Sequence, residues 1–497
     1  MDKPLVQKVV IAGGGTAGWV AAAALAQQLG RLIEITLVES DDIGTVGVGE
    51  ATIPTVQAFH KLLALDEREF MRATQGTFKL GIAFEHWARQ GDRYIHSFGS
   101  IGKSTWMADF HNVWLEAKSK GFGGELGDYC FELQAAEADK FYTSDSSPMN
   151  YAYHFDAGLY ARYLRGYGEA RGVKRIEGKI SRVEQNAATG FVDALVMETG
   201  ERVPGDLFID CTGFRGLLIE QTLKAGWEDW GQWLAMDSAL AVQTASNDEM
   251  LPYTRSIARQ AGWQWRIPLQ HRVGNGLVYS SEHLTQEEAR ETLVKNLDAK
   301  PLFEPRLIRF RTGRRRKIWD KNCISMGLSS GFLEPLESTS IHLIMIGVTR
   351  LIQLFPFFGC TPALIERYND LSRNEFERIR DFIILHYKLT ERDDTVFWRQ
   401  CRDMEIPETL KERIALFLER GFAYQAPGDL FRVDSWVQVM LGQRVKPQGR
   451  HLIGRMMGDD AQLKKALDSL KANISAAVAK LPRHKDFVQS YCPAQPE

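Results

Sequence analysis

The sequence predicts an α/β fold that begins with a strand, glycine-rich turn, helix and strand, continues into a strand-rich region and ends in a mostly helical part. Short apolar runs bounded by turn residues predict the strands. Apolar residues recur at helical spacing beyond Pro356 and predict the last helices. We expect the first strand, a glycine-rich turn, a helix and the second strand over residues 7–12, 13–18, 20–29 and 34–39. The late helices are expected over residues 361–385, 408–420 and 460–479.

The composition limits the kinds of partner that the chain can have. Its 497 residues include 61 basic and 63 acidic side chains, with a formal net charge of −2. This balance argues against nucleic acid as the main partner, and we interpret the basic run at 314–317 as a solvated turn. The N-terminus shows no signal-peptide pattern, and no apolar run approaches the roughly 18 residues of a membrane span. We therefore expect a cytoplasmic protein without a membrane partner.

The cysteine pattern bears on metal binding and on the cellular compartment. The chain has six cysteines without a CxxC pair or a Cys/His cluster at metal-ligand spacing. Such a pattern is typical of reduced thiols, and we expect no metal site. The cysteines are Cys130, Cys211, Cys323, Cys360, Cys401 and Cys492.

The glycine-rich turn reads Gly13-Gly14-Gly15-Thr16-Ala17-Gly18. In this motif Gly13 permits the tight bend, Gly15 lets the backbone approach a pyrophosphate, and Gly18 lets helix and strand pack closely. Glu39 ends the second strand, where it is placed to accept a hydrogen bond from a ribose hydroxyl. We predict dinucleotide binding, with a tight turn in another kind of α/β protein as the alternative. The motif does not choose between FAD and NAD.

A glycine-rich loop over residues 42–54 is too long for a simple turn, and such loops are usually functional or mobile. A helix expected over 55–71 then leads to the apolar, strand-like run 77–84, which contains Lys79. A lysine among apolar neighbours either extends to the surface or is held for chemistry. From these residues alone we favour extension to the surface.

The middle of the chain alternates strand-like and polar segments. A helix is expected over 156–171, followed by hairpin-forming strands over 173–183 and 191–203. The next strand ends at Asp210, which is either a cofactor contact or a plain turn acid. A last buried strand is expected over 322–328.

Residues 331–343 combine two carboxylates and three hydroxyls with the start of an apolar, helix-like run. Ser338 or Thr339 can cap this helix. The amides of Thr339 and Ser340 would carry the positive end of the helix dipole, where a small anion, a phosphate or a flavin edge can bind. An ordinary capped helix is an equal alternative.

Taken together, several motifs resemble the flavin-dependent tryptophan halogenase family. Their order and spacing over roughly the first 340 residues match the family. The WxWxIP pattern distinguishes these enzymes from the related flavin monooxygenases. The motifs are Gly13–Gly18, Val48-Gly49-Glu50-Ala51-Thr52-Ile53-Pro54, Lys79-Leu80-Gly81, Trp263-Gln264-Trp265-Arg266-Ile267-Pro268 and Glu334-Pro335-Leu336-Glu337-Ser338-Thr339.

The resemblance implies an FAD-binding Rossmann-like fold of the glutathione-reductase type and a set of site residues. Lys79 and Glu337 would be catalytic, and the amides of Thr339 and Ser340 would hold the halide. His96, Phe98 and Trp436 would contact the substrate, with core packing as the alternative for each. The residues implied to bind FAD are Gly13, Gly15, Thr16, Ala17, Gly18, Glu39, Glu50, Ala51, Val183, Asp210, Leu328 and Ile341.

The resemblance also implies the chemistry. FADH2 and O2 would oxidise chloride or bromide to hypohalous acid, which would travel through a tunnel to Lys79 and halogenate an electron-rich aromatic. Glu337 would orient the halogen donor and stabilise the cationic ring intermediate. The family usually has glycine where this chain has Ser340, and a serine has less backbone freedom but keeps the amide donor. A separate NAD(P)H-dependent flavin reductase would be the partner, and a homodimer remains open.

One departure concerns the substrate. Enzymes that act on free tryptophan hold its polar end with a tyrosine pair and a glutamate, whereas residues 428–434 show no equivalent. We therefore expect an indole or another arene as the substrate. A flavin monooxygenase is the nearest alternative function, and a non-catalytic flavin-binding or carrier protein is an alternative of another class.

The expected division of the chain follows from these motifs. Three separated parts of the chain would bind FAD. An insertion and a sheet would bind the substrate, and the helical C-terminal part would close the active site. In that order, the ranges are 1–100, 151–216 and 311–355 for FAD, 101–150 and 217–310 for the substrate, and 356–497 for the helical part.

Overall fold

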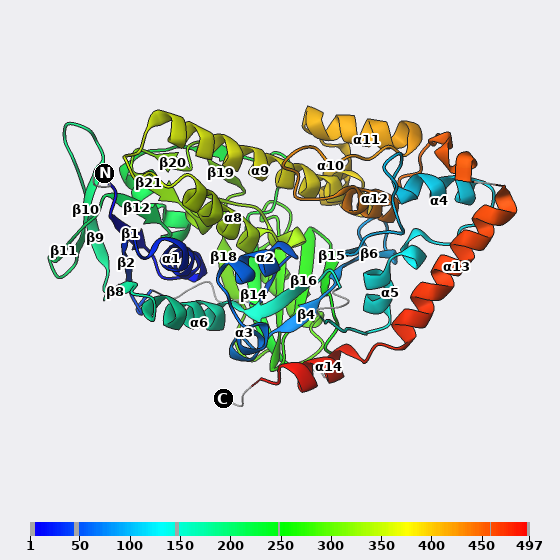
Figure 1. Ribbon diagram of the computed structural model, residues 1–497, viewed down its shortest axis with the longest axis horizontal. Coiled ribbons are helices and arrows are strands. Elements are labelled where there is room, and N and C mark those ends of the chain that lie inside the picture. Colours follow the sequence, from blue (N-terminus) through cyan, green and yellow to red (C-terminus); the bar gives the residue numbers. More distant parts are fainter. Residues whose placement is uncertain (1–4, 44–48, 145–148, 247–248, 458, 495–497) are drawn as a thin grey trace.

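The computed structural model describes residues 5–43, 49–144, 149–246, 249–457 and 459–494. Residues 44–48 of the glycine-rich loop, Val48 among them, therefore lie outside the described part. Figure 1 shows a nucleotide-binding-type sheet at one end of the molecule, a large sheet in the middle and a group of helices at the other end.

The sheet that carries the glycine-rich turn has the strand order β20-β21-β12-β1-β2-β8, with β1 pairing in parallel with β12 and β2. Helix α1 packs against α6 and α8, because its run of fully buried alanines lets neighbouring helices approach closely. This arrangement confirms the predicted α/β fold. The strands are β1 (Lys8–Ala12), β2 (Glu34–Glu39), β8 (Lys174–Glu177), β12 (Leu207–Asp210), β20 (Trp319–Asp320) and β21 (Cys323–Ser325). The helices are α1 (Thr16–Leu29), α6 (Ala157–Glu169) and α8 (Ser340–Gln353).

The middle sheet has the order β18-β14-β17-β16-β15-β5-β6. Its strands come mostly from residues 238–309, but β5 and β6 come from the first 100 residues, which thus contribute to both sheets. The bounds are β5 (Gly81–Glu85), β6 (Arg93–Ser97), β14 (Ser238–Ala245), β15 (Thr254–Arg259), β16 (Gly262–Pro268), β17 (Arg272–Tyr279) and β18 (Arg306–Arg309). Helix α7 (Gln286–Lys295) lies between β17 and β18 in the chain.

Three smaller antiparallel sheets complete the strands. They are β3 (Gly49–Ala51), β7 (Ala152–Asp156) and β4 (Thr77–Lys79); β11 (Arg202–Pro204), β10 (Val192–Met197) and β9 (Ile180–Gln185); and β13 (Trp227–Asp229), β19 (Gly313–Arg315) and β22 (Gly331–Phe332). The run 77–84 is therefore not one strand, because the chain passes from β4 to β5 at Leu80 and changes sheets. Residues 173–183 likewise divide between β8 and β9.

The basic run at 314–317 is not a solvated turn as a whole. Arg314 and Arg315 are each 5% exposed and belong to strand β19. The Arg315 guanidinium donates to the carbonyl of Ser329 and to Glu220, and Arg314 pairs with Glu228. Burial is possible because each guanidinium has found carbonyl or carboxylate partners.

The early helices differ from prediction in one place. The single helix expected over 55–71 is two helices, α2 (Thr55–Leu62) and α3 (Glu67–Ala73). Between them Ala64 adopts a positive φ of 51°, and the Asp66 side chain caps α3 by accepting from the Glu69 amide. Helices α4 (Phe110–Ser119) and α5 (Phe131–Glu137) follow.

The C-terminal part is helical, as predicted. Helix α9 (Pro362–Lys388) is long and passes from the nucleotide-binding end towards the helical end, where α11, α12 and α13 gather (Figure 1). The remaining bounds are α10 (Val396–Asp403), α11 (Glu408–Arg420), α12 (Val433–Gly442), α13 (Asp460–Ala479) and α14 (His484–Tyr491). In the described residues, none of the helices has both the length and the apolar character needed to cross a bilayer.

Candidate active site

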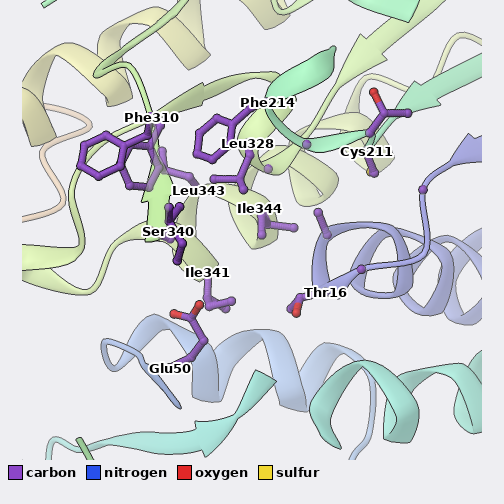
Figure 2. A pocket seen from close by; sticks show the side chains of 18 of the residues that line it. Thr16, Glu50, Cys211, Phe214, Phe310, Leu328, Ser340, Ile341, Leu343 and Ile344 are labelled. Carbon is purple, nitrogen blue, oxygen red and sulfur yellow. The ribbon is translucent and has the colours of Figure 1, made fainter. Parts of the chain in front are cut away.

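A cavity of about 540 Å³ opens between the start of α1, the start of α8 and the middle sheet. Figure 2 shows Thr16 at the start of α1 and Ser340, Ile341 and Ile344 of α8 around this space. Of the residues predicted to bind FAD, those that line the cavity are Gly13, Gly15, Thr16, Ala17, Glu39, Glu50, Ala51, Leu328 and Ile341.

The glycine turn is built for close backbone approach. Gly13 has a φ of 104°, and a Cβ atom there would lie 2.4 Å from the carbonyl oxygen of Cys211. Gly15 is the N-cap of α1 and offers no side chain to bond the first amides. The open helix start can therefore receive a phosphate, and the cavity that continues from it to α8 fits an extended dinucleotide such as FAD.

Three residues predicted to bind the cofactor do not line the cavity. A Cβ at Gly18 would lie 1.9 Å from the carbonyl oxygen of Gly13, so Gly18 serves the packing of the helix on the turn. Asp210 is fully buried and accepts hydrogen bonds from the amides of Thr212, Leu218 and Ile219, so it shapes the turn after β12. Val183 lies further along β9 than Ile180, which does line the cavity.

Glu39 lines the cavity but is already engaged. Its Oε1 atom accepts from Arg175 at 2.6 Å, and its Oε2 atom accepts from the Trp19 indole at 3.4 Å. An arginine partner was not foreseen, because Arg175 is 136 residues away in the chain. The carboxylate that lines the cavity is thus held in place from the protein side.

The sequence reading placed residues 263–268 in a sheet over the substrate. The structure brings Trp263, Trp265 and Ile267 to the wall of the cavity. Every residue of strand β16 is buried, so an alternation of polar and apolar residues could not reveal which face of the strand meets a ligand.

Lys79 does not reach the surface. Its side chain is 0% exposed, and Nζ donates to the Thr52 carbonyl at 3.0 Å and to Ser338 Oγ at 2.8 Å. Burial lowers the pKa of the amine to about 7, against the opposing charge of Glu337. The lysine thus joins the glycine-rich loop to the segment before α8.

Glu337 is also fully buried and lies between two histidines. His96 Nδ1 is 2.9 Å from Oε2, and His386 Nε2 is 2.8 Å from Oε1. Burial would raise the pKa of this carboxyl, but the charge of His96 and the polar contacts with His386 and His96 outweigh it and lower the pKa to about 2. Glu337 is therefore a carboxylate at neutral pH.

His386 was missed because it lies on the buried face of α9, where a histidine usually serves packing. Its Nδ1 atom donates to the Phe382 carbonyl at 2.9 Å, so that nitrogen carries a hydrogen. His386 Nε2 also lies 2.8 Å from Oε1 of Glu337. The atoms are not aligned for a hydrogen bond, and the contact is electrostatic.

Glu334, three residues before Glu337, is in the opposite state. Burial raises its pKa to about 8, although the Tyr387 hydroxyl donates to it at 2.6 Å. The segment thus holds a neutral carboxylic acid, Glu334, and a carboxylate, Glu337, three residues apart. Their different surroundings, and not their residue types, set the two roles.

The start of α8 is not capped as expected. Ser338 has a positive φ of 58° and bonds Lys79, while Thr339 is the N-cap without a side-chain capping bond. Within the described part of the chain, the buried Thr339 Oγ1 atom has no hydrogen-bond partner. A buried hydroxyl without a partner beside a helix N-terminus is a suitable place for an anion.

His96 contacts Glu337, Phe98 lies beside Lys79, and Trp436 is linked to His96 through residues that the sequence did not reveal. The Phe98 ring centroid lies 5.1 Å from Lys79 Nζ. Phe382 of α9 packs against His96 at 5.5 Å and against Trp436 at 4.9 Å, and Phe431 stacks on Phe382. Neither phenylalanine belongs to a sequence motif, so only the tertiary structure shows them.

Comparison with known proteins shows the family to which the chain belongs. The tryptophan halogenase family model matches residues 8–459. A tryptophan 6-halogenase of Streptomyces toxytricini is 37% identical over 82% of this chain and 83% of its own, and a tryptophan 7-halogenase of Lentzea aerocolonigenes is 36% identical over 85% and 83%. A solved flavin-dependent halogenase of Xanthomonas campestris is 53% identical, with a TM-score of 0.97 over 99% of both chains. The chain therefore belongs to the tryptophan halogenase family and is an FADH2-dependent halogenase with an FAD-binding Rossmann-like fold.

Proposed function

We propose that the enzyme uses FADH2, O2 and chloride or bromide to make hypohalous acid, with which it halogenates an electron-rich aromatic such as an indole. One observation carries this proposal. Ser338 lines the cofactor cavity and also accepts the hydrogen bond of Lys79, so a single segment links the cavity to a buried amine beside Glu337.

The residues divide the work as follows. FADH2 and O2 supply the oxidant that turns halide into hypohalous acid. The amides of Thr339 and Ser340, together with the free Thr339 hydroxyl, hold the halide at the positive end of α8. The Ser340 side chain replaces only a glycine hydrogen and leaves its amide available.

Lys79 receives the oxidised halogen. Because its pKa is near 7, part of the population carries a neutral amine at neutral pH. This amine hydrogen-bonds hypohalous acid, or attacks its halogen to form a haloamine while the oxygen–halogen bond breaks and water leaves. The Phe98 ring beside Nζ excludes water from this point.

Glu337 acts on the ring. As a carboxylate it stabilises the positive charge that develops on the arene and accepts the ring proton. His96 and His386 hold both of its oxygens, which fixes its direction without neutralising it by protonation.

The substrate is an indole or another small arene and not free tryptophan. Residues 428–434 place Phe431 and Arg432 near the aromatic wall, and they offer no tyrosine pair and glutamate for an amino-acid group. A separate NAD(P)H-dependent flavin reductase would supply FADH2.

The test is product analysis. The enzyme, FAD, a reductase and O2 are incubated with bromide or chloride over a panel of indoles, phenols and pyrroles, and mass spectrometry records halogen isotope patterns. Halogenated product that disappears in Glu337→Gln supports the proposal. Hydroxylated product would favour a monooxygenase, and no product from any arene would favour a flavin carrier.

A further inference from the structure

The aromatic site is closed. Glu337 and Phe382 are 0% exposed, and His96, Trp436 and Phe98 are 2%, 3% and 9% exposed. Interiors are packed without room for a further ring. For an arene to reach Glu337, one of the surrounding side chains must move.

The backbone around the site limits which side chain that is. His96 is held in the ladder of β6 with β5, Phe382 lies inside α9, and Trp436 lies in α12. Phe98 follows the end of β6, and its amide donates to the Leu80 carbonyl at 2.9 Å. Phe431 alone among these aromatic residues lies in the segment 421–432, which contains neither helix nor strand. The backbone that carries Phe431 can shift without breaking a ladder or a helical hydrogen bond.

Phe431 also has the geometry of a bound arene. Its ring stacks on Phe382 with centroids 3.7 Å apart and an angle of 16° between the planes. The same ring lies 6.2 Å from the His96 ring, which contacts Glu337. A flat ring stacked here is placed as an aromatic substrate would be.

The neighbours show that the place can take a ligand. The Arg413 guanidinium covers one face of Trp436 at 4.3 Å, so an arene can stack only on the other face. In the part of the chain that the structure describes, the buried Trp436 indole N–H has no hydrogen-bond partner. A buried donor of this kind is normally completed by a bound group or water.

The segment is anchored close to Phe431. The Asp429 side chain is 3% exposed and pairs with Arg413 and with Arg378. The anchor lies two residues before Phe431, so the ring can leave its place while the segment stays attached to α11 and α9.

We propose that Phe431 is a specificity-determining residue whose ring occupies the arene position in the substrate-free enzyme and leaves when the substrate binds. The space that it vacates sets the size of the arene that the site accepts. This inference rests on the proposed function, because it takes Glu337 as the point where the arene reacts.

The alternative is that Phe431 is a fixed wall. The two readings predict opposite effects for Phe431→Ala. Removal of a ring that competes with the arene strengthens arene binding, whereas removal of a wall weakens it. Phe422 lies in the same segment, is 40% exposed and stacks on Tyr424, so Phe422→Ala is a matched control.

The experiment is calorimetric titration of the oxidised, FAD-loaded enzyme with indole and with the larger tetrahydro-β-carboline. We expect Phe431→Ala to bind the larger arene about three- to tenfold more tightly and indole no more weakly, the scale of one aromatic pair. Phe431→Trp should bind both more weakly, and Phe422→Ala should match the wild type. Weaker or unchanged binding of both arenes by Phe431→Ala would overturn the proposal.

One further variant, and a comparison with the halogenation assay, distinguish failure of the inference from poor folding and from failure of the proposed function. Phe431→Leu keeps apolar packing without a stacking ring and should reproduce the alanine result, even if Phe431→Ala folds poorly. The titration needs neither halide nor reduced flavin. If the expected order of affinities holds but no arene is halogenated, the proposed function fails, and only the part of the inference that concerns arene binding at Phe431 stands.

Discussion

The Gln438 side chain pairs with the backbone of Ser97 on both sides. Its Oε1 atom accepts from the Ser97 amide at 2.9 Å, and its Nε2 atom donates to the Ser97 carbonyl at 3.2 Å. Because β6 is the last strand of its sheet, this amide takes the place of a neighbouring strand. It thereby fixes α12, which carries Trp436, to the strand that carries His96.

We expect Gln438→Ala to raise the KM for the arene by about five- to tenfold, the effect of about 1 kcal/mol from two lost hydrogen bonds. The affinity for FAD should not change, since Gln438 does not line the cavity. Steady-state kinetics with a flavin-binding titration checks this. Gln462→Ala on the exposed face of α13 is the control, and an unchanged KM in Gln438→Ala would remove the positioning role.

Lys79→Met should abolish halogenation while FAD still binds, because it removes the amine but keeps most of the apolar stem. Product by mass spectrometry and FAD affinity by fluorescence titration are the two measurements. Lys174→Met changes an exposed lysine on β8 and should leave both unchanged. Turnover retained in Lys79→Met would contradict the assignment.

The pH dependence of the rate should follow the same amine. The neutral form of Lys79 increases as pH rises through about 7, so the rate should rise over that range. Ser338 Oγ accepts from Nζ and favours the charged amine. Ser338→Ala should therefore move the rising limb to lower pH, and a limb that moves to higher pH would argue against the neutral amine as the reactive form.

Glu334→Gln should change how stability depends on pH. The folded enzyme holds the Glu334 pKa at about 8, above the ordinary value of 4.5, so its contribution to stability is complete below pH 4.5 and is lost as pH rises towards 8. Glutamine does not titrate and still accepts from Tyr387. Urea unfolding should show the variant gaining on the wild type between pH 5 and 8.5 by a few kcal/mol, at about 1.36 kcal/mol per pKa unit. A constant difference across that range would show that Glu334 is ionised in the folded enzyme.

Thr339→Val should raise the KM for bromide by about fivefold, because it removes one hydrogen-bond donor of about 1 kcal/mol and keeps the shape. Ser340→Gly keeps the amide and should leave the KM for bromide within about twofold of the wild type. Rates measured over a bromide series decide this. If Thr339→Val keeps the wild-type KM for bromide, the Thr339 hydroxyl is not part of the halide site. A raised KM for bromide in Ser340→Gly would instead show that the Ser340 side chain contributes to it.

Prediction and structure agree where residues close together in the sequence specify an element, and they differ where distant residues do. The glycine turn, the strand at 34–39 and the helices at 408–420 and 460–479 agree with prediction, because caps and apolar periodicity within one element specify them. The single run at 77–84 and the single helix at 55–71 were wrong. In each case one short break, at Leu80 and at Ala64, depends on which sheet or helix the chain joins next.

The sequence by itself determined the family motifs, because they stand in a fixed order along the chain, and the resemblance that they carry implied FAD as the cofactor and Lys79 and Glu337 as candidate catalytic residues. Only the tertiary structure decided their states. Lys79 is buried against Ser338, Glu337 contacts His386 from 49 residues away, and Phe431 stacks on Phe382. Burial and the partners that distant elements bring to a side chain set its charge and its freedom to move, and neither can be read from its neighbours in sequence.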